Sequence, residues 1–198
     1  MSFGGGQIEY KLLFTGPMGA GKTTAIHSIS EIEPVRTEAT NTTAGGSGKA
    51  TTTVGLDYGE ISLGNGERLR LYGTPGQDRF SALWEILTTG AMGVVILVDH
   101  SDPESYERME HFLDSFAGLI TETAGVIGLT HTEDAPDRPM DPYYEALAQR
   151  YMMLPVMPVD ARSSEDIRGL LDALLSILES RLAESSMDSM ADEVSGDV

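Results

Sequence analysis

The chain has 198 residues, which fits one domain, and its 40% hydrophobic content is ordinary for a globular protein that buries a core. It carries 31 acidic and 13 basic residues, and the resulting formal charge of −18 repels nucleic acid and anionic lipid, so neither is expected as a partner. The absence of cysteine excludes disulfides, thiolate metal ligands, a cysteine nucleophile and prenyl or palmitoyl anchors.

The N-terminal sequence MSFGGGQIEYK lacks the order of a signal peptide. No apolar run approaches the ~18 residues that are needed to cross a bilayer. We therefore expect a cytoplasmic protein with no direct membrane anchor.

Strand and helix signals alternate along the chain, which indicates an α/β fold with a mainly parallel sheet. The apolar residues 8–15 predict the first strand. Residues 31–50 are polar and without periodicity, so they predict a mobile loop. Residues 51–63 and 67–72 flank Asn65-Gly66, which favours a two-residue hairpin turn. These two strands should therefore be antiparallel neighbours.

The second half of the chain predicts three more strands, at residues 93–99, 125–129 and 154–159. Helices are expected to begin at Asp102-Pro103, Asp141-Pro142 and Ser163, because each offers a capping side chain or a proline for the first turn. The last helix carries an apolar face formed by Ile167, Leu170, Leu171, Leu174, Leu175 and Leu178. After Arg181 the chain has five acids and no base, so residues 185–198 predict a disordered acidic tail after a domain at residues 1–184.

A phosphate-binding sequence, GPMGAGKTT, follows the first strand and leads into a helix that opens at Lys22. It has the form G-x-x-x-x-G-K-[ST], in which glycines let backbone N–H groups point at phosphate oxygens and the helix N-terminus adds its dipole. Lys22 can bridge the β and γ phosphates, and the Thr23 hydroxyl can ligate Mg²⁺. The nucleotide contacts predicted here are Gly16, Gly19, Ala20, Gly21, Lys22, Thr23 and Thr24.

Two further segments, TTTVGLDYG at residues 51–59 and GTPGQDRF at residues 73–80, follow downstream. With the phosphate loop they resemble the two switches of Ras-like small GTPases, and the TPGQ form resembles the bacterial MglA-type and conservon-type branch. The resemblance implies a P-loop NTPase fold, the small G-domain: a three-layer sandwich with a mostly parallel six-stranded sheet in which only strand two is antiparallel. It also implies that Thr53 binds Mg²⁺ and the γ-phosphate, that Gly76 N–H contacts the γ-phosphate, and that Gln77 orients the attacking water.

The metal site departs from the family pattern. Gly73 stands where the family's D-x-x-G has the aspartate that holds Mg²⁺ through water. Asp57 and Asp99 are the nearest carboxylates that could replace it, although Asp99 equally fits a strand-end cap. We expect water, Thr23 and Thr53 to carry the metal, with a weaker affinity for Mg²⁺.

The base-recognition sequence departs as well, since LTHTED stands where the family has Asn-Lys-x-Asp. The resemblance aligns Thr130, His131 and Glu133 with the base-binding residues. Glu133 can accept hydrogen bonds from guanine N1 and N2, His131 can lie over the purine ring, and Asp134 could serve in place of Glu133. Ala161, in VDAR, could present its N–H to the guanine carbonyl. Guanine is therefore favoured over adenine, with an ordinary polar loop as the competing interpretation.

These features favour a small GTPase that binds GTP and GDP with Mg²⁺, hydrolyses GTP slowly and acts through protein effectors. Phe80 and Trp84 are the expected effector contacts, although Trp84 equally fits the core. Arg36 and Arg79 are candidates for an arginine that assists hydrolysis in cis, although each also fits a solvated surface charge. The resemblance implies a regulator of the Roadblock/LC7 kind and a place in a bacterial polarity or signalling module.

Two alternatives stay open. One is a nucleotide-bound interaction module with little or no turnover, which Gly73 and the altered base motif favour. The other is an ATP-preferring P-loop enzyme such as a kinase, although the sequence shows no evident acceptor site or arginine lid.

Overall fold

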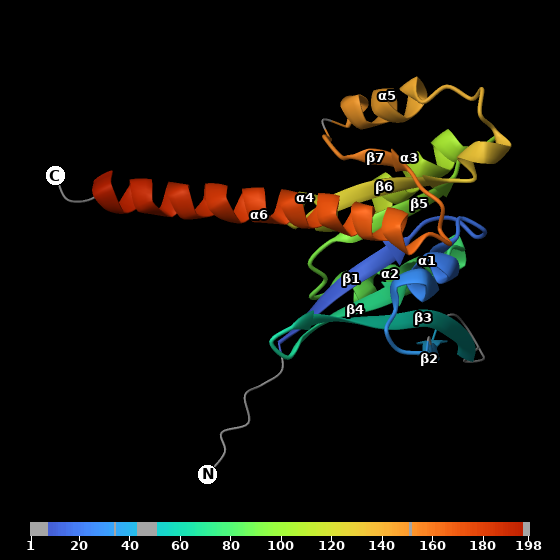
Figure 1. Cartoon of the computed structure of the whole chain (residues 1–198), viewed down its shortest axis with the longest axis horizontal. Helices are drawn as coiled ribbons and strands as arrows, with labels where there is room; N and C mark the ends of the chain where they lie inside the picture. The colour runs from blue at the N-terminus through green and yellow to red at the C-terminus, as the bar shows by residue number, and fades with distance from the viewer. Residues whose placement is uncertain (1–7, 34, 43–50, 151, 196–198) are drawn as a thin grey trace, which may run out of the picture.

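The computed structural model describes residues 8–33, 35–42, 51–150 and 152–195, with the backbone alone for residues 35–42, 51–54 and 185–195. Its strands are β1 Glu9–Thr15, β2 Val35–Thr42, β3 Thr51–Gly64, β4 Glu67–Gly73, β5 Val94–Asp99, β6 Gly125–Thr130 and β7 Val156–Pro158. They form one sheet in the order β2-β3-β4-β1-β5-β6-β7 (Figure 1). β3 is antiparallel to both neighbours, and the other described pairings are parallel.

The six predicted strands are all present, and the predicted antiparallel strand is β3. The turn between β3 and β4 lies at Asn65-Gly66, where φ is 50° and 83°. Asparagine and glycine tolerate this left-handed region better than other residues. The hairpin prediction is therefore confirmed.

The prediction of a mobile loop over residues 31–50 was wrong for residues 35–42, which form β2 at the sheet edge. Residues 43–50 lie outside the described part of the chain. β2 pairs with β3 from Val35 opposite Tyr58 to Thr42 opposite Thr51. Its sequence, VRTEATNT, has β-branched residues but lacks the apolar and polar alternation by which a half-buried strand is recognised. β2 thus adds a seventh strand to the six predicted.

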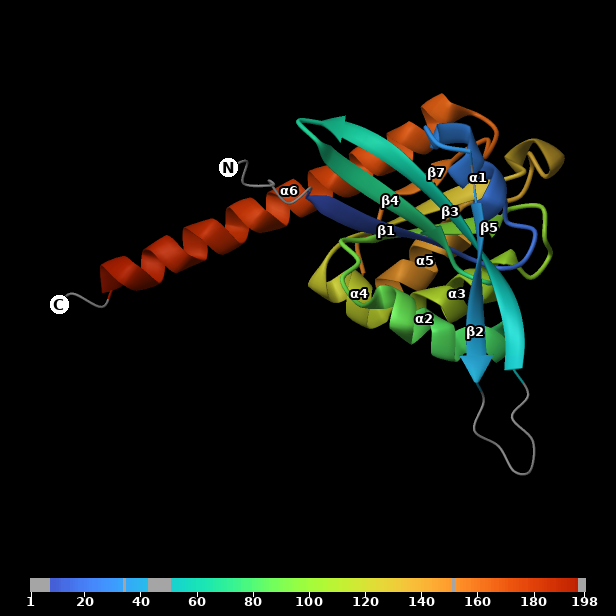
Figure 2. The ribbon, with the colours of Figure 1, turned by 90° about the horizontal axis from the view of Figure 1, so that it is seen from below.

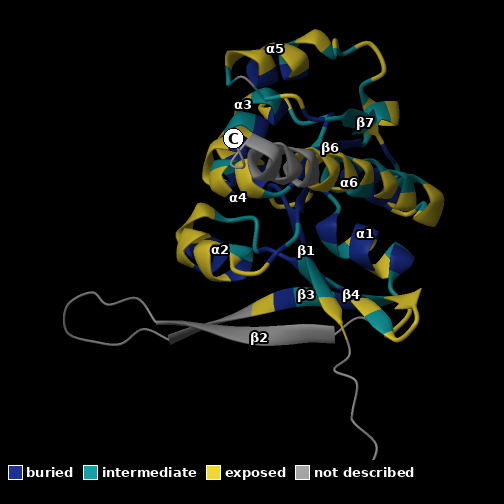
Figure 3. Ribbon diagram, turned by 90° about the vertical axis from the view of Figure 1, so that its left-hand side faces the viewer, coloured by how far each residue is buried: buried dark blue, intermediate teal, exposed yellow. Residues whose placement is uncertain are grey.

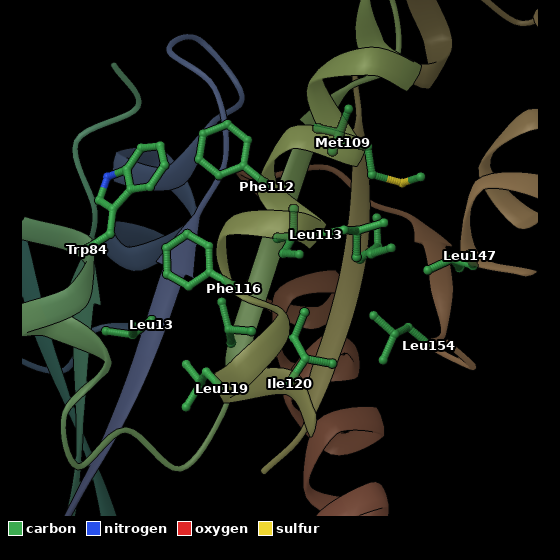
Figure 4. Close-up of a cluster of buried hydrophobic side chains, with 14 of the residues drawn as sticks. Leu13, Trp84, Met109, Phe112, Leu113, Phe116, Leu119, Ile120, Leu147 and Leu154 are labelled. Carbon is green, nitrogen blue, oxygen red and sulfur yellow. The ribbon is translucent and has the colours of Figure 1, made fainter. Parts of the chain in front are cut away.

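Helices cover both faces of the sheet (Figures 1 and 2). They are α1 Lys22–Ile29, α2 Ser81–Thr88, α3 Ser105–Ser115, α4 Ala117–Glu122, α5 Asp141–Gln149 and α6 Ser164–Ser195. α1 and α6 pack on one face around Ile26 and Leu170. The other four helices pack on the opposite face around Trp84, Phe112 and Leu147, a cluster shown in Figure 4. The three-layer α/β architecture is therefore confirmed.

The central strand β5 has a continuous apolar sequence because both of its faces are covered by helices. Val94, Ile96 and Val98 join the cluster under α2 to α5, whereas Val95 and Leu97 join the cluster under α1 and α6. All five side chains are fully buried, because alternate residues of a strand face opposite sides of the sheet. Figure 3 shows the buried residues gathered between the layers.

Helix starts agree with the sequence in two of three places. α5 begins at Asp141, and α6 begins after Ser163, whose hydroxyl accepts the backbone N–H of Asp166 at 3.2 Å. α3 begins at Ser105 rather than at Asp102. The Asp102 carboxylate accepts the N–H of Glu104 at 3.0 Å, so it caps a turn that precedes the helix.

α6 is longer than predicted and extends past the sheet (Figure 1). The prediction of a disordered tail was wrong for residues 185–195, which are helical. Between Gly169 and Gly196 the sequence has neither glycine nor proline, so nothing local ends the helix sooner. The domain limit at residue 184 stays a prediction. Within the described residues, no helix combines the length and apolar character that spanning a membrane requires.

Candidate functional site

The phosphate loop, residues 16–21, joins the end of β1 to the start of α1. Three of its glycines have positive φ, at 134° for Gly16, 89° for Gly19 and 88° for Gly21. A Cβ at position 16 would lie 2.0 Å from the carbonyl oxygen of Leu97, so no side chain fits there. The loop therefore adopts a backbone that glycine supplies at little cost.

Lys22 holds this loop in its curled form. Its ammonium donates hydrogen bonds to the carbonyls of Gly16 at 2.7 Å and Pro17 at 2.6 Å. The residue is 8% exposed. Burial lowers the pKa of the ammonium to about 8, an effect that the nearby Asp57 carboxylate opposes. The cation predicted to meet the phosphates is thus already positioned inside the loop.

A carboxylate stands beside Thr23 even though position 73 is glycine. The Thr23 hydroxyl donates a hydrogen bond to Asp57 Oδ2. Asp57 lies on β3 directly opposite Gly73 of β4. A Cβ at position 73 would lie 3.0 Å from the Asp57 Cβ and 3.3 Å from its Oδ2. Asp57 therefore lies against the space that a side chain at position 73 would need.

Asp99, the other carboxylate considered for the metal, serves a different purpose. It accepts hydrogen bonds from the backbone N–H of Ser101 at 2.9 Å and from its hydroxyl at 2.6 Å. This is the strand-end cap named as its alternative role.

Thr53 is not brought to this site. It lies in β3, paired with Thr40, and precedes Asp57 by four residues of continuous strand. That separation corresponds to about 13 Å along a strand. Its role as a metal ligand stays a prediction, one that requires the start of β3 to move.

The TPGQ segment packs directly over the phosphate loop. Thr74 is 2% exposed, and its hydroxyl lies 2.8 Å from that of Thr15 at the end of β1. Gly76 has no room for a side chain, because a Cβ there would lie 2.6 Å from the backbone nitrogen of Met18. Gly76 is therefore adjacent to the loop that should hold the phosphates.

Phe80 and Trp84 are buried, so their prediction as exposed effector contacts was wrong, whereas the alternative that Trp84 belongs to the core is confirmed. Their exposed fractions are 7% and 4%. Trp84 packs against Phe112 of α3 and Phe116, which lies between α3 and α4, and donates from its indole nitrogen to the carbonyl of Pro75 at 2.9 Å. Trp84 therefore belongs to the core and anchors the TPGQ segment.

Gln77 lies at the rim of the same turn, where its amide nitrogen is 3.6 Å from the Met18 sulfur. Arg79 is exposed, and its guanidinium lies 4.7 Å from the ring centre of Phe80. The backbone of Arg36 lies in β2 opposite Asp57, and its side chain is outside the description. The catalytic part of Gln77 and the assistance of either arginine stay predictions.

On the base side, Thr130 ties two loops together. It is 1% exposed, and its hydroxyl lies 3.3 Å from the carbonyl oxygen of Ala20 and 3.2 Å from that of Val98. His131 follows with a φ of 55°, and its Nδ1 lies 3.5 Å from Asp99 Oδ1. Thr130 therefore links the base loop to the phosphate loop rather than pointing its hydroxyl at a base.

A charged cluster stands at the outer side of the base pocket. Arg162 binds Asp160 with two hydrogen bonds of 2.8 Å, and this pairing lowers the pKa of the Asp160 carboxyl to about 2. The same guanidinium lies 3.6 Å from Glu133 Oε1. Ala161 packs on the phosphate loop, since a Cβ at Gly21 would lie 2.9 Å from the Ala161 Cβ. Sequence reasoning did not single out Arg162, whose guanidinium lies beside both carboxylates.

Three adjoining cavities form one cleft. The phosphate cavity has a volume of about 310 Å³ and is lined by Lys22, Thr23, Asp57 and Gly76, among others. The base cavity, of about 360 Å³, is lined by Thr130, His131, Glu133, Asp134, Asp160, Ala161 and Arg162, and it shares Gly19, Gly21 and Thr24 with the phosphate cavity. A third cavity, of about 440 Å³, is lined by Met18, Gly55, Asp57, Pro75, Gly76, Gln77 and Phe80. Most of the predicted site residues thus line one cleft, whereas Gly16 and Ala20 are buried in the phosphate loop behind it and Thr53 is in none of the three linings.

Comparison with known proteins places this cleft in context. The model of a family described as conserved hypothetical ATP binding protein matches residues 33–195. The chain belongs to this family. The match begins at residue 33, after the phosphate loop. The assignment of that loop therefore rests on its own sequence motif.

This family member is also similar to Ras-related proteins. It is 24% identical to the Ras-related protein SEC4 of Candida albicans, over 69% of this chain and 67% of that protein. It is 27% identical to the Ras-related protein RabC of Dictyostelium discoideum, over 54% and 52%. It is 24% identical to the Ras-related protein Rab-27B of Bos taurus, over 90% and 84%. The relatives support the Ras-like superfamily, and the fold is the P-loop G-domain that the motifs predicted.

Proposed function

We propose that the chain is a Mg²⁺-dependent GTP-binding switch protein that hydrolyses GTP slowly and acts by binding effectors. The observation that carries the proposal is the contact between Thr23 and Asp57 beside a formed phosphate loop. It joins a hydroxyl and a carboxylate, two hard oxygen donors, in the cavity that Gly76 also lines. The Ras-related relatives support the guanine nucleotide and the switch role.

In this proposal Thr23 and Asp57 hold Mg²⁺, with phosphate and water oxygens completing its coordination. When bound, the ion neutralises charge that develops on the phosphates. Within the described residues no three His, Cys, Asp or Glu side chains gather as a metal site. Thr53 would join this set after a rearrangement of β3.

The chain's own groups divide the remaining work. Lys22 neutralises the β and γ phosphates, the Gly76 N–H binds a γ-phosphate oxygen, and Gln77 orients the attacking water. On the base side the Glu133 carboxylate accepts from guanine N1 and N2. The Ala161 N–H binds the guanine carbonyl.

The TPGQ form of the second switch supports the MglA-type or conservon-type branch. We therefore include a Roadblock/LC7-type regulator and a cytoplasmic role in a bacterial polarity or signalling module. Because Phe80 and Trp84 are buried, the effector surface of this proposal uses exposed neighbours, such as Arg79 and the 67% exposed Ile86.

An ATP-preferring enzyme is the second candidate, and the description of the matching family favours it. Glu133 argues for guanine, because a carboxylate accepts from N1–H and the N2 amine, whereas adenine N1 is itself an acceptor. The third candidate, an interaction module without turnover, shares every binding feature and differs only in hydrolysis.

The first experiment identifies the nucleotide released when the purified protein is denatured, and then measures GTP and ATP in competition. We expect a guanine nucleotide and tighter binding of GTP; tighter binding of ATP would sink the guanine assignment. Single-turnover phosphate release follows, with Gln77→Leu expected to slow it about 100-fold, and the exposed Gln149→Leu as the matched control. No release with or without a Roadblock-type partner would leave the interaction module.

A second experiment tests the metal assignment. Asp57→Ala should weaken Mg²⁺ affinity about 10- to 100-fold, as expected for loss of a group that orients or binds the metal. The double variant Asp57→Gly, Gly73→Asp returns a carboxylate to the opposite position of the strand pair and should restore most of that affinity. Mg²⁺ titration of the release rate of a fluorescent nucleotide measures both, with the exposed Asp172→Ala as control. An unchanged Mg²⁺ requirement in Asp57→Ala removes Asp57 from the metal site.

A further inference from the structure

The base loop, residues 131–140, connects β6 to α5 and carries Glu133 in a short helical turn. A backbone hydrogen bond from Ala135 to the carbonyl of Thr132, at 3.3 Å, closes this turn. Another, from Arg138 to the carbonyl of Ala135 at 3.1 Å, closes the next one. Because the two turns follow each other directly, a displacement of Ala135 or Arg138 displaces Glu133 as well. The position of the Glu133 carboxylate therefore depends on what holds this loop.

Arg138 fastens the loop to the segment that leads into α3. Its guanidinium donates hydrogen bonds to the carbonyls of Asp102 at 2.8 Å and Pro103 at 2.9 Å. It also lies 4.4 Å from the ring centre of Tyr106, a distance at which cation–π attraction acts. The Tyr106 hydroxyl in turn donates to the carbonyl of Pro139 at 2.8 Å. Two residues of the base loop are thus bound to the part of the chain that follows β5.

A buried polar network holds the same loop from the sheet side. His100, the residue after β5, is 2% exposed. Its Nδ1 lies 2.9 Å from the Tyr143 hydroxyl, which donates to the Ser105 hydroxyl at 2.9 Å. The imidazole also has hydrogen bonds with the backbone of Ala135 and Arg138. Because Tyr143 and Ser105 are fully buried, no part of this network is exchanged with bulk water.

This network fixes a single position of the base loop. Burial lowers the pKa of the His100 imidazole, and the Arg138 guanidinium lowers it further, so the ring is uncharged at neutral pH. A packed apolar contact tolerates small shifts, whereas directional hydrogen bonds between buried groups select one arrangement. The base loop is therefore held relative to β5 by directional contacts as well as by packing.

We propose that His100, Tyr143 and Arg138 are positioning residues that hold the base loop where Glu133 discriminates guanine from adenine. The inference rests on the proposed function, in which the Glu133 carboxylate accepts from guanine N1 and N2. A displacement of about 1 Å would lengthen these hydrogen bonds beyond the range in which they form. None of the three residues lines the base cavity, so they act on the nucleotide through Glu133.

The decisive variant is Tyr143→Phe, which removes the hydroxyl between His100 and Ser105 and keeps the ring. Competition titrations measure the affinities for GTP, ATP and inorganic tripolyphosphate, which has no base. We expect GTP affinity to fall about three- to tenfold, as for the loss of one buried hydrogen bond, with the other two unchanged. Tyr144→Phe, at the 49% exposed neighbour on α5, is the matched control and should change none of the three affinities.

Arg138→Met tests the other attachment of the loop, at a side chain that is only half-buried. It removes the donors to the carbonyls of Asp102 and Pro103 and keeps an unbranched stem. We expect the same selective loss of GTP affinity, with the exposed Arg168→Met as control. In a Glu133→Ala background neither Tyr143→Phe nor Arg138→Met should lower GTP affinity further, because their effect passes through Glu133.

The outcomes separate this inference from the proposed function. If the wild type prefers GTP and both variants keep that preference in full, the inference is overturned and the proposed function stands. Equal losses for GTP, ATP and tripolyphosphate, or an effect that persists without Glu133, also overturn the inference, because they indicate a general structural role. A wild type that prefers ATP refutes the guanine assignment itself and the inference with it.

Discussion

The two ends of the nucleotide cleft are built in different ways. The phosphate end relies on backbone shape, with Gly16 pressed on the carbonyl of Leu97 and Lys22 held by loop carbonyls. The base end relies on side chains, among which Glu133 and Arg162 are exposed. A backbone shape leaves few solutions, whereas a side-chain contact admits chemical equivalents. The phosphate end accordingly follows the family pattern, except that the carboxylate is Asp57 on β3, opposite Gly73, instead of a residue at position 73 itself. The base end departs from the pattern.

A substitution at the phosphate end should have the largest effect on stability and nucleotide affinity. Gly16→Ala places a methyl group 2.0 Å from the Leu97 oxygen in a left-handed backbone, so the loop cannot keep its shape. We expect a loss of about 3 kcal/mol or more in unfolding free energy and nucleotide affinity reduced more than about 100-fold.

Gly19→Ala is the matched control for this prediction. It adds the same methyl group at positive φ but meets no atom within 4 Å. It should cost about 1 kcal/mol from backbone strain alone. Thermal denaturation and nucleotide titration measure both variants, and equal losses would mean that close packing on Leu97 is unimportant.

A substitution at the base end should change the choice between GTP and ATP and leave phosphate binding intact. Glu133→Gln keeps the shape of the side chain but removes the charge that accepts from guanine, so the preference for GTP over ATP should fall about 10- to 100-fold. ATP affinity should change little, because the phosphate end is untouched. Competition titrations measure both nucleotides, with Glu145→Gln on α5 as an exposed control. Equal losses for GTP and ATP would contradict a role in base recognition.

Removal of the Thr130 hydroxyl, which links the two ends, should have the smallest effect on stability and affinity. Thr130→Val removes the hydroxyl that lies 3.3 Å from the Ala20 carbonyl and 3.2 Å from that of Val98 while keeping the side-chain volume. We expect about 1 kcal/mol less stability and a loss of affinity below about threefold, equal for GTP and ATP. Thermal denaturation and competition titration check this, with the exposed Thr121→Val as control. A loss confined to GTP would show that Thr130 recognises the base directly.

The phosphate loop could be read from the sequence because its requirements are local. Glycine spacing and a following helix define it, and neither depends on distant residues. The burial of Trp84 depends on Phe112 of α3 and on Phe116, which follows that helix, and no local pattern reveals these contacts. β2 is defined by its backbone pairing with β3, and its sequence lacks the alternation that marks a half-buried strand.

The position of Asp57 shows most clearly what could not be predicted from the sequence. The turn at residues 65–66 pairs Gly64 with Glu67, and an unbroken register from there would place Asp57 opposite Thr74. The ladder shifts by one residue between Ser62 and Gly64, and this irregularity brings Asp57 opposite Gly73. A one-residue shift changes which side chains are neighbours, and the sequence does not mark where it occurs. The sequence therefore offered Asp57 as one candidate to replace the missing aspartate, but only the strand register shows that it lies opposite Gly73.

The strand that carries Asp57 also decides how firmly the carboxylate is held. β4 lies between β3 and β1, whereas β3 is separated from the sheet edge by β2 alone. Local opening starts most readily at such edges, at a free energy below that of global unfolding. A carboxylate on β3 thus responds to fraying of an edge hairpin while β1, β4 and β5 remain folded. In hydrogen-exchange terms, we expect the proposed metal ligand to lie in a less protected unit than Lys22, which begins α1 just after the inner strand β1.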